Sequence, residues 1–174
     1  MMESSDNHVR PKSGWLMIVA GWALGLLVIT YYFSHVLEKQ NNPNTLSVLS
    51  GQVGELVLER NRNGHYIAEG SINGVPVNFL LDTGATQIAV PLAVAQSAGL
   101  TEGDIQLVQT AGGTTRVRDT LVDSIAIGPL RFSKLRGVIV PAMEGEEVLL
   151  GMNVLRQLDT VEHDGLLILR PSDG

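Results

Sequence analysis

An apolar run that leads directly into an aspartate and a tight turn constrains this chain more than any other feature. The segment is Leu80–Thr86, with the sequence LLDTGAT. Such a pattern is typical of a strand that presents a carboxylate where it ends. Because Asp-Thr-Gly also occurs in ordinary turns, a second segment matters: Val148–Leu158 (VLLGMNVLRQL) places two apolar residues and a glycine before a helical pattern. Together the two segments make Asp82 the leading candidate for a catalytic residue.

Short β patterns separated by turn residues fill most of the chain after His65. Asn73-Gly74, between Tyr66–Ile72 and Val75–Leu81, predicts a hairpin with a type I′ turn. Further strands are expected at Ile88–Val90, Ile105–Thr110, Thr114–Arg118, Leu121–Ile127, Leu135–Val140 and Leu166–Leu169. Short helices are expected at Pro91–Ala98, which Gly99 ends, and at Met152–Leu158. Many short strands with few short helices predict an all-β, barrel-like domain.

Composition excludes several classes of function. The net charge of −6 and the pI near 5.1 argue against a protein that binds nucleic acid. The chain has no cysteine, which excludes disulfides, thiolate metal sites and a cysteine nucleophile. The four histidines have no metal-ligand spacing; they are His8, His35, His65 and His163. We therefore expect neither a metal nor a cofactor.

A charge-free apolar stretch, Trp15–Phe33, precedes the β region. As a helix it spans about 28 Å, close to the thickness of a bilayer's hydrocarbon core. The alternatives are a cleaved signal peptide, for which the stretch is long, and a buried core helix. Arg10 and Lys12 precede it, whereas Lys39 is offset by Glu38, so the positive-inside rule favours a cytoplasmic N-terminus. We expect a single-pass anchor in the inner (cell) membrane, with an exported, periplasmic C-terminal domain.

These patterns predict four regions of the chain: a cytoplasmic N-terminus at 1–13, a transmembrane helix at 14–34, a linker at 35–61 and a β domain at 62–174. The linker is polar and contains Asn41-Asn42-Pro43-Asn44, which is typical of a tether. Leu56 and Leu58 allow an additional strand within it, but the pattern is too short to decide.

The two segments around Asp82 and Gly151 resemble those of the half-molecule aspartic proteases, the retropepsin type, over about residues 62 to 171. In detail the chain is similar to the membrane-anchored bacterial branch. The resemblance implies a half-barrel fold and an endopeptidase that hydrolyses peptide bonds. Peptide hydrolysis of this kind uses two close carboxylates that share one proton. This chain has only one carboxylate in such a setting, so we expect a homodimer that pairs two copies of Asp82.

The resemblance also implies roles for residues around the aspartate. Thr83 is expected to hydrogen-bond across the dimer axis, and Gly84 to allow a tight backbone and close approach of the substrate. The segment expected to pack beside the aspartate turn is Leu149, Leu150 and Gly151. The residues expected to contact the peptide are Gly84, Ala85 and Thr86, with Gly112 and Gly113 at the tip of a flap hairpin.

The chain departs from the viral members at one paired position. Those enzymes usually carry an aspartate at the position of Thr86 and an arginine at that of Met152, and the two form an ion pair. Loss of both partners costs less than loss of one. Two alternatives to a membrane-bound endopeptidase stay open: a non-catalytic, membrane-tethered module that docks peptides on the same fold, and a zymogen that removes its own tether near residues 40 to 62.

Overall fold

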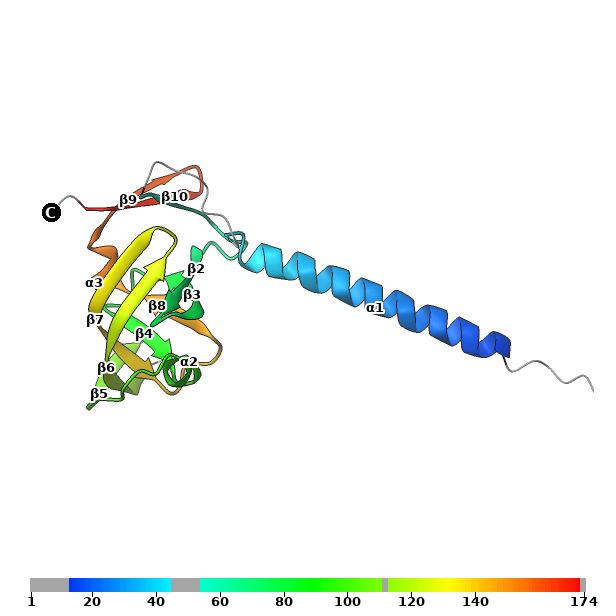
Figure 1. Ribbon diagram of the computed structural model, residues 1–174, viewed down its shortest axis with the longest axis horizontal. Coiled ribbons are helices and arrows are strands. Elements are labelled where there is room, and N and C mark those ends of the chain that lie inside the picture. Colours follow the sequence, from blue (N-terminus) through cyan, green and yellow to red (C-terminus); the bar gives the residue numbers. More distant parts are fainter. Residues whose placement is uncertain (1–12, 45–53, 111–112, 173–174) are drawn as a thin grey trace, which may run out of the picture. The chain divides into compact units, whose positions relative to one another are not determined.

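The computed structural model describes residues 13–44, 54–110 and 113–172. It divides into two units, Met1–Lys39 and Gln40–Gly174, which we describe separately. Figure 1 shows one long helix and a β domain. The helices are α1 (Ser13–Asn41), α2 (Leu92–Ser97) and α3 (Met152–Leu155). The strands are β1 (Leu56–Glu59), β2 (Ile67–Ile72), β3 (Val75–Leu81), β4 (Ile88–Pro91), β5 (Ile105–Thr110), β6 (Gly113–Ile127), β7 (Leu130–Val140), β8 (Glu147–Leu150), β9 (Leu158–His163) and β10 (Leu166–Pro171).

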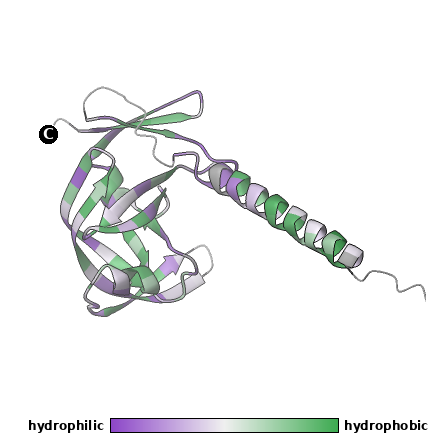
Figure 2. Cartoon of the chain, turned by 45° about the vertical axis from the view of Figure 1, so that its right-hand side comes forward, coloured by the Kyte–Doolittle hydropathy of each residue, from purple (hydrophilic) through white to green (hydrophobic). Residues whose placement is uncertain are grey.

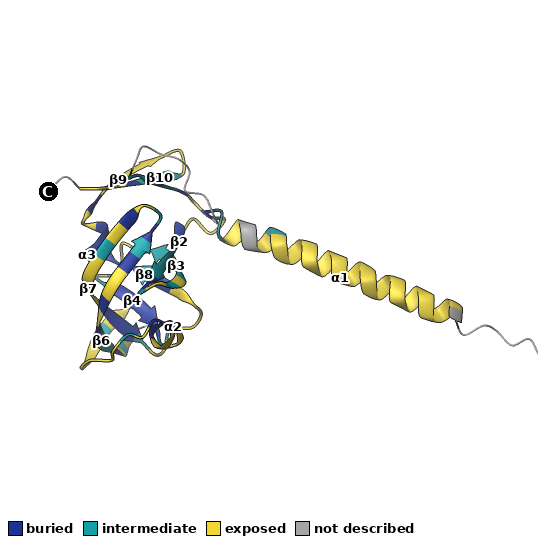
Figure 3. Ribbon diagram, in the orientation of Figure 1, coloured by how far each residue is buried: buried dark blue, intermediate teal, exposed yellow. Residues whose placement is uncertain are grey.

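Helix α1 covers the expected apolar span and extends beyond its expected end at residue 34. Its segment Gly14–Leu37 has a mean hydropathy of 2.0 and spans about 36 Å at 1.5 Å per residue. Figure 2 shows hydrophobic residues along most of this helix, and Figure 3 shows that most of its described residues are exposed. A membrane anchor and a signal sequence both have this length and composition.

The expected hairpin at Asn73-Gly74 is confirmed. Strands β2 and β3 pair antiparallel in a register that places Ile72 opposite Val75. Asn73 and Gly74 have φ angles of 50° and 83°, as both central residues of a type I′ turn require. The side-chain amide of Asn73 also donates to the carbonyl of Ala98, which holds the hairpin against the end of α2.

Seven strands form one sheet that closes on itself. Their order is β2-β3-β8-β4-β7-β6-β5, and β2 also pairs with β6, so the sheet becomes a barrel with β5 as an extension. The expected all-β, barrel-like fold with short helices is therefore confirmed. The core of the domain is apolar; its largest fully buried side chains are Phe79, Ile72, Ile88, Ile125, Ile127, Ile139 and Leu150 of the barrel, with Leu58 of β1 and Leu169 of β10.

The long strand β6 corrects an expectation of two strands, at Thr114–Arg118 and Leu121–Ile127. Asp119 and Thr120 interrupt the apolar pattern, yet both pair with β7 in an unbroken register. Their polar groups have partners outside the strand: the N–H of Asp119 donates to the carbonyl of Asp104, and the hydroxyl of Thr120 donates to that of Thr101. Polar residues are stable within a strand where the neighbouring loop supplies such bonds.

A second, three-stranded sheet has the order β1-β10-β9. It corrects the expected helix at Met152–Leu158, because α3 ends at Leu155 and Leu158 begins β9 instead. Leu158 packs in the same apolar core as Leu56 and Leu58 of β1. Because β1 pairs with β10, the segment before residue 62 contributes a strand to the domain. Residues 45–53 of the expected linker lie outside the described residues.

The chain just after α1 is bonded to the β domain through Asn44. This side chain is only 4% exposed. Its amide nitrogen donates to the carbonyls of Glu59 (3.0 Å) and Ile67 (2.8 Å), and its oxygen accepts the N–H of Glu59 (2.7 Å). Asn44 therefore satisfies backbone groups of both β1 and β2.

Candidate active site

The Asp82 turn follows directly from the end of β3. Three hydrogen bonds define its shape: the N–H of Asp82 donates to the carbonyl of Leu150 (3.2 Å), that of Ala85 to the carbonyl of Asp82 (3.2 Å), and that of Gly84 to Oδ1 of Asp82 (2.8 Å). The last bond fixes the orientation of the carboxylate. Asp82 is half-buried, so its carboxylate lies between the core and the solvent.

Strand β8 runs parallel to β3, which brings the two sequence segments together. Leu80 lies opposite Leu149, and Leu81 opposite Leu150. Leu150 is fully buried in the core, whereas Leu149 is half-buried. The Leu149–Gly151 segment thus lies beside the end of β3, directly before the aspartate turn.

Gly151 stands where a side chain has no space. A Cβ at this position would lie 2.5 Å from the carbonyl oxygen of Gln87 and 2.8 Å from its nitrogen. Two bonds continue the contact beyond the glycine, from the N–H of Met152 to the carbonyl of Ala85 (2.8 Å) and from that of Asn153 to the carbonyl of Thr86 (3.1 Å). The start of α3 is therefore bonded to the backbone of the aspartate turn.

Gly84 is required by the space beside the carboxylate and not by an unusual backbone conformation. Its backbone lies outside the left-handed region that favours glycine. A Cβ at this position would lie 3.1 Å from Oδ1 of Asp82, closer than ordinary contact. Gly84 is exposed, as is the neighbouring Thr83, so both present their surfaces to solvent in the single chain.

A cleft of about 590 Å³ opens in front of the carboxylate. The described residues that line it come from the aspartate turn, β4, the β5–β6 hairpin, β7 and β8: Asp82, Gly84, Ala85, Thr86, Gln87, Ala89, Val108, Gln109, Thr110, Thr115, Val138, Val140, Met143 and Leu149. Half of these residues have apolar side chains. Asp82 is the only carboxylate among them.

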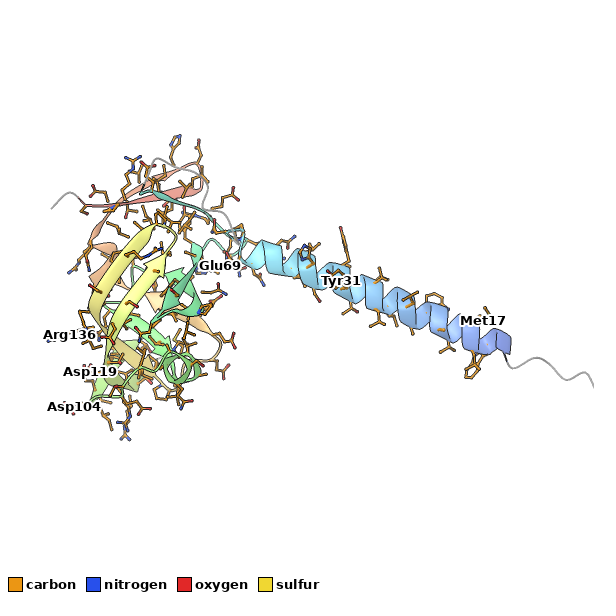
Figure 4. All side chains as sticks on the ribbon, in the orientation of Figure 1. Met17, Tyr31, Glu69, Asp104, Asp119 and Arg136 are labelled. Atoms are coloured by element: carbon orange, nitrogen blue, oxygen red, sulfur yellow. The ribbon has the colours of Figure 1, made fainter. Side chains whose placement is uncertain are left out.

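The four other aspartates considered as catalytic candidates lie elsewhere. Asp104, Asp119, Asp123 and Asp159 are absent from the described lining of the cleft. Figure 4 shows Asp104, Asp119 and Arg136 near the end of the domain that carries β5. Asp119 lines a separate cavity and accepts a hydrogen bond from Gln106. None of these four carboxylates lines the cleft beside Asp82.

The hairpin of β5 and β6 contributes to the same cleft as the aspartate. Val108, Thr110 and Thr115 line it, while Gly113 begins β6 with a φ of +109°, which glycine adopts without strain. The expected contact residue Gly112 lies outside the described residues, together with Ala111. The described part of the hairpin therefore forms one wall of the cleft that contains Asp82.

Sequence reasoning missed several residues of this site. Gln87 borders both Gly151 and the cleft, and Val138 and Val140 line the cleft from β7. The two valines carry no sequence signal, because apolar strand residues look alike whether they face a core or a cleft. Asn153 was also missed; it bonds Thr86 through its N–H and the carbonyl of Arg136 through its side-chain amide (2.7 Å). A polar residue within the apolar run Met152–Leu155 was the available signal.

Comparisons with known proteins agree with this geometry. A family model described as "gag-polyprotein putative aspartyl protease" matches residues 68–157, about half of the chain. An uncharacterized protein of Rickettsia prowazekii (strain Madrid E) is 30% identical, with 87% of this chain and 69% of that protein covered. An uncharacterized Sinorhizobium protein, from the region 5′ of cobV, is 26% identical, with 88% and 69% covered.

Among solved structures, a retropepsin-like aspartic protease from Rickettsia conorii matches with a TM-score of 0.57 and 30% identity. The match covers 69% of this chain and 93% of that one. The chain therefore belongs to the retropepsin-like aspartic protease family, as the two segments around Asp82 and Gly151 indicated.

Proposed function

We propose that this chain is a membrane-anchored, homodimeric aspartic endopeptidase in which Asp82 is the catalytic residue. One observation carries the proposal: the described lining of the cleft contains a single carboxylate. Metal-free peptide hydrolysis by carboxylates needs two of them at the same step, an ionised one that activates water and a protonated one that donates to the carbonyl oxygen. A second copy of the chain supplies the missing group, because two-fold symmetry places identical residues opposite each other.

In this mechanism the two Asp82 carboxylates share one proton, since like charges about 3 Å apart cannot both be ionised. The ionised carboxylate takes a proton from a water molecule, and the resulting nucleophile attacks the peptide carbonyl carbon. The protonated carboxyl group donates to the carbonyl oxygen as the tetrahedral intermediate forms. Proton transfer to the amide nitrogen then allows the C–N bond to break.

The neighbouring residues have supporting roles in the proposal. Thr83 joins the two turns across the axis, while Gly84 leaves space beside the carboxylate oxygen. The segment Leu149–Gly151 packs against the turn and keeps it in position. The residues that contact the peptide backbone are Gly84, Ala85 and Thr86, with Gly112 and Gly113 at the hairpin tip.

The proposed organisation of the chain follows from the apolar helix. Residues 14–34 are the membrane-embedded part of α1, residues 1–13 lie in the cytoplasm, and residues 62–174 form the protease domain on the periplasmic side. Helix α1 supports this arrangement by its length and its exposed apolar surface. Anchoring two copies in one membrane also raises their effective concentration, which favours the dimer.

Proteolysis by the full-length chain in lipid vesicles tests the catalytic role. We expect pepstatin-sensitive cleavage of an unstructured protein, and a loss of at least about a hundredfold in kcat/KM for Asp82→Asn. The matched control is Asp104→Asn, an exposed carboxylate in a loop outside the described cleft, which should leave the rate unchanged. Equal cleavage by Asp82→Asn and the unmodified chain would refute the catalytic role of Asp82, whereas peptide binding without cleavage by either protein would favour the docking module.

A further inference from the structure

We infer that this chain prefers peptides with an acidic side chain beyond the two residues that flank the scissile bond, and that Arg136 recognises that side chain. The inference rests on the proposed function, because it concerns the peptide that the catalytic cleft would bind. It assigns the recognition to a second cavity of about 460 Å³, called here the Arg136 cavity. The described residues that line this cavity are Gln87, Gln106, Asp119, Thr120, Leu121, Arg136 and Gly137.

The first observation is that the Arg136 cavity adjoins the cleft that contains Asp82. Gln87 lines both of them and is half-buried between the aspartate turn and β4. An extended peptide advances about 3.3 Å per residue. A peptide that follows the cleft past Gln87 would therefore place one of its later side chains in the Arg136 cavity.

Strand pairing places the charged residues of this cavity on the same face of the sheet as the cleft. Paired residues share a face, and so do residues two apart along a strand. Asp119 lies opposite Val138, which lines the cleft and also lies opposite Ala89 of β4. Arg136 precedes Val138 by two residues. Figure 4 shows Arg136 and Asp119 on the same side of the domain, so cleft and cavity are successive parts of one surface.

The β5–β6 hairpin contributes to both parts of this surface. Val108 lines the cleft, and Gln106, two residues earlier on β5, lines the Arg136 cavity. Val117, which lies opposite Gln106, packs with Ala89 and Val138 in a buried apolar cluster. This cluster holds the hairpin against β4 and β7, so one packed layer supports the cleft and the cavity together.

Within the cavity, Arg136 has the charged group that lacks a partner. The carboxylate of Asp119 accepts a hydrogen bond from the side-chain amide of Gln106 (2.5 Å). Among the described residues, no carboxylate lies within ion-pair distance of the Arg136 guanidinium, whereas Arg118 on the neighbouring strand is paired with Glu102. A guanidinium presents its N–H donors in a planar fork that matches a carboxylate. An aspartate or glutamate side chain of the peptide therefore suits this position.

The proposed homodimer contains this cavity twice. Two-fold symmetry places one Arg136 cavity on each side of the paired Asp82 carboxylates. A single bound peptide crosses the axis between them. An acidic residue should therefore be favoured at one position before the scissile bond and at one position after it.

Cleavage of matched peptides by the full-length chain, in vesicles of zwitterionic lipid, tests this preference. The peptides differ only in a glutamate, glutamine or lysine, placed in turn at each position beyond the scissile pair. We expect kcat/KM for the glutamate peptide to exceed that for the glutamine peptide at least about threefold at the recognised positions. Arg136→Gln should reduce this ratio to about one, and Arg136→Glu should favour lysine instead.

The matched control is Arg116→Gln, which removes the same charge from the other face of the hairpin. Arg116 is exposed, lies opposite the exposed Leu107 and is absent from the described linings of the cleft and of the Arg136 cavity. The control should keep the preference for glutamate. An equal loss of that preference in Arg116→Gln and Arg136→Gln would overturn the assignment to Arg136, because it would indicate a general effect of net charge.

A second variant, Asp119→Asn, tests the sign of the recognition. The Asp119 carboxylate repels an acidic ligand in the same cavity, so its removal should raise the glutamate-to-glutamine ratio further. If instead the unmodified chain prefers lysine and Asp119→Asn abolishes that preference, the cavity recognises basic side chains and the inference is wrong.

Binding separates this inference from the proposed function. Fluorescence anisotropy of labelled peptides measures their affinity for Asp82→Asn, in which cleavage does not interfere. We expect the glutamate peptide to bind about threefold more tightly than the glutamine peptide, and this difference to vanish when Arg136→Gln is added. If the unmodified chain cleaves no peptide while the difference persists, the catalytic proposal fails and the inference stands. Cleavage of all peptides at one rate, with equal affinities, would overturn the inference and leave the proposed function intact.

Discussion

The backbone N–H of Asp82 donates to the carbonyl oxygen of Leu150 at 3.2 Å, and this bond joins the two segments on which the site is built. It lies at the ends of two parallel strands, β3 and β8, that are distant in sequence. Gly151 follows at once and packs on the backbone of Gln87. The position of the carboxylate therefore depends on the barrel and on one glycine as much as on the turn itself.

Gly151→Ala should destabilise the domain because its Cβ would meet backbone atoms that cannot move freely. We expect a loss of about 1–3 kcal/mol in the free energy of unfolding, measured by thermal unfolding of the full chain in detergent. Gly84→Ala is the matched comparison, since its Cβ would meet only the side-chain oxygen of Asp82. It should change stability by less than about 1 kcal/mol and lower kcat/KM instead. Equal stability losses in the two variants would contradict this account.

Asn44→Ala should destabilise the β domain, because this side chain bonds backbone groups of both β1 and β2. The substitution leaves the buried carbonyl of Ile67 and the partly buried N–H and carbonyl of Glu59 without their partner, and a buried group left unpaired costs about 1–3 kcal/mol. We expect a total loss of about 2–4 kcal/mol, measured by chemical denaturation. Asn63→Ala, at an exposed position, is the control and should have little effect. A loss below about 0.5 kcal/mol for Asn44→Ala would show that water replaces the amide.

Thr86→Asp and Met152→Arg should stabilise the chain only in combination. The backbone bonds from Met152 to Ala85 and from Asn153 to Thr86 bring the two positions close together. An aspartate and an arginine placed there should form an ion pair with a coupling energy of about 0.5–1 kcal/mol. A double-mutant cycle of unfolding free energies measures this coupling. Strict additivity of the two single changes would contradict it.

Gly113→Ala should impair the hairpin that lines the cleft. A φ of +109° strains any side chain, at a cost of about 1–3 kcal/mol. We expect faster hydrogen exchange in Ile105–Thr110 and a several-fold lower kcat/KM, because the hairpin opens locally. Gly74→Ala has a comparable strain, at φ +83°, in a hairpin outside the described cleft. It should lower stability without slowing cleavage, so equal kinetic effects would refute a role for the hairpin.

Local patterns predicted much of the fold. The Asn73-Gly74 turn, the helix that Gly99 ends and most strands follow from residue types whose effects act over a few positions. The errors have physical causes. Strand β6 continues through Asp119 and Thr120 because distant loop carbonyls and N–H groups bond them, and Leu158 begins a strand because β10 is available to pair with it.

The candidate site divides in the same way. The sequence alone identified Asp82, the turn around it and the Leu149–Gly151 segment, because a carboxylate after an apolar strand and a glycine after an apolar pair are unusual enough to recognise. Only the tertiary structure placed Gln87, Val108 and Val138 around the cleft and Arg136 in a cavity beside it. Those features arise from strand order and register, which depend on contacts between residues far apart in the chain and leave no local pattern to read.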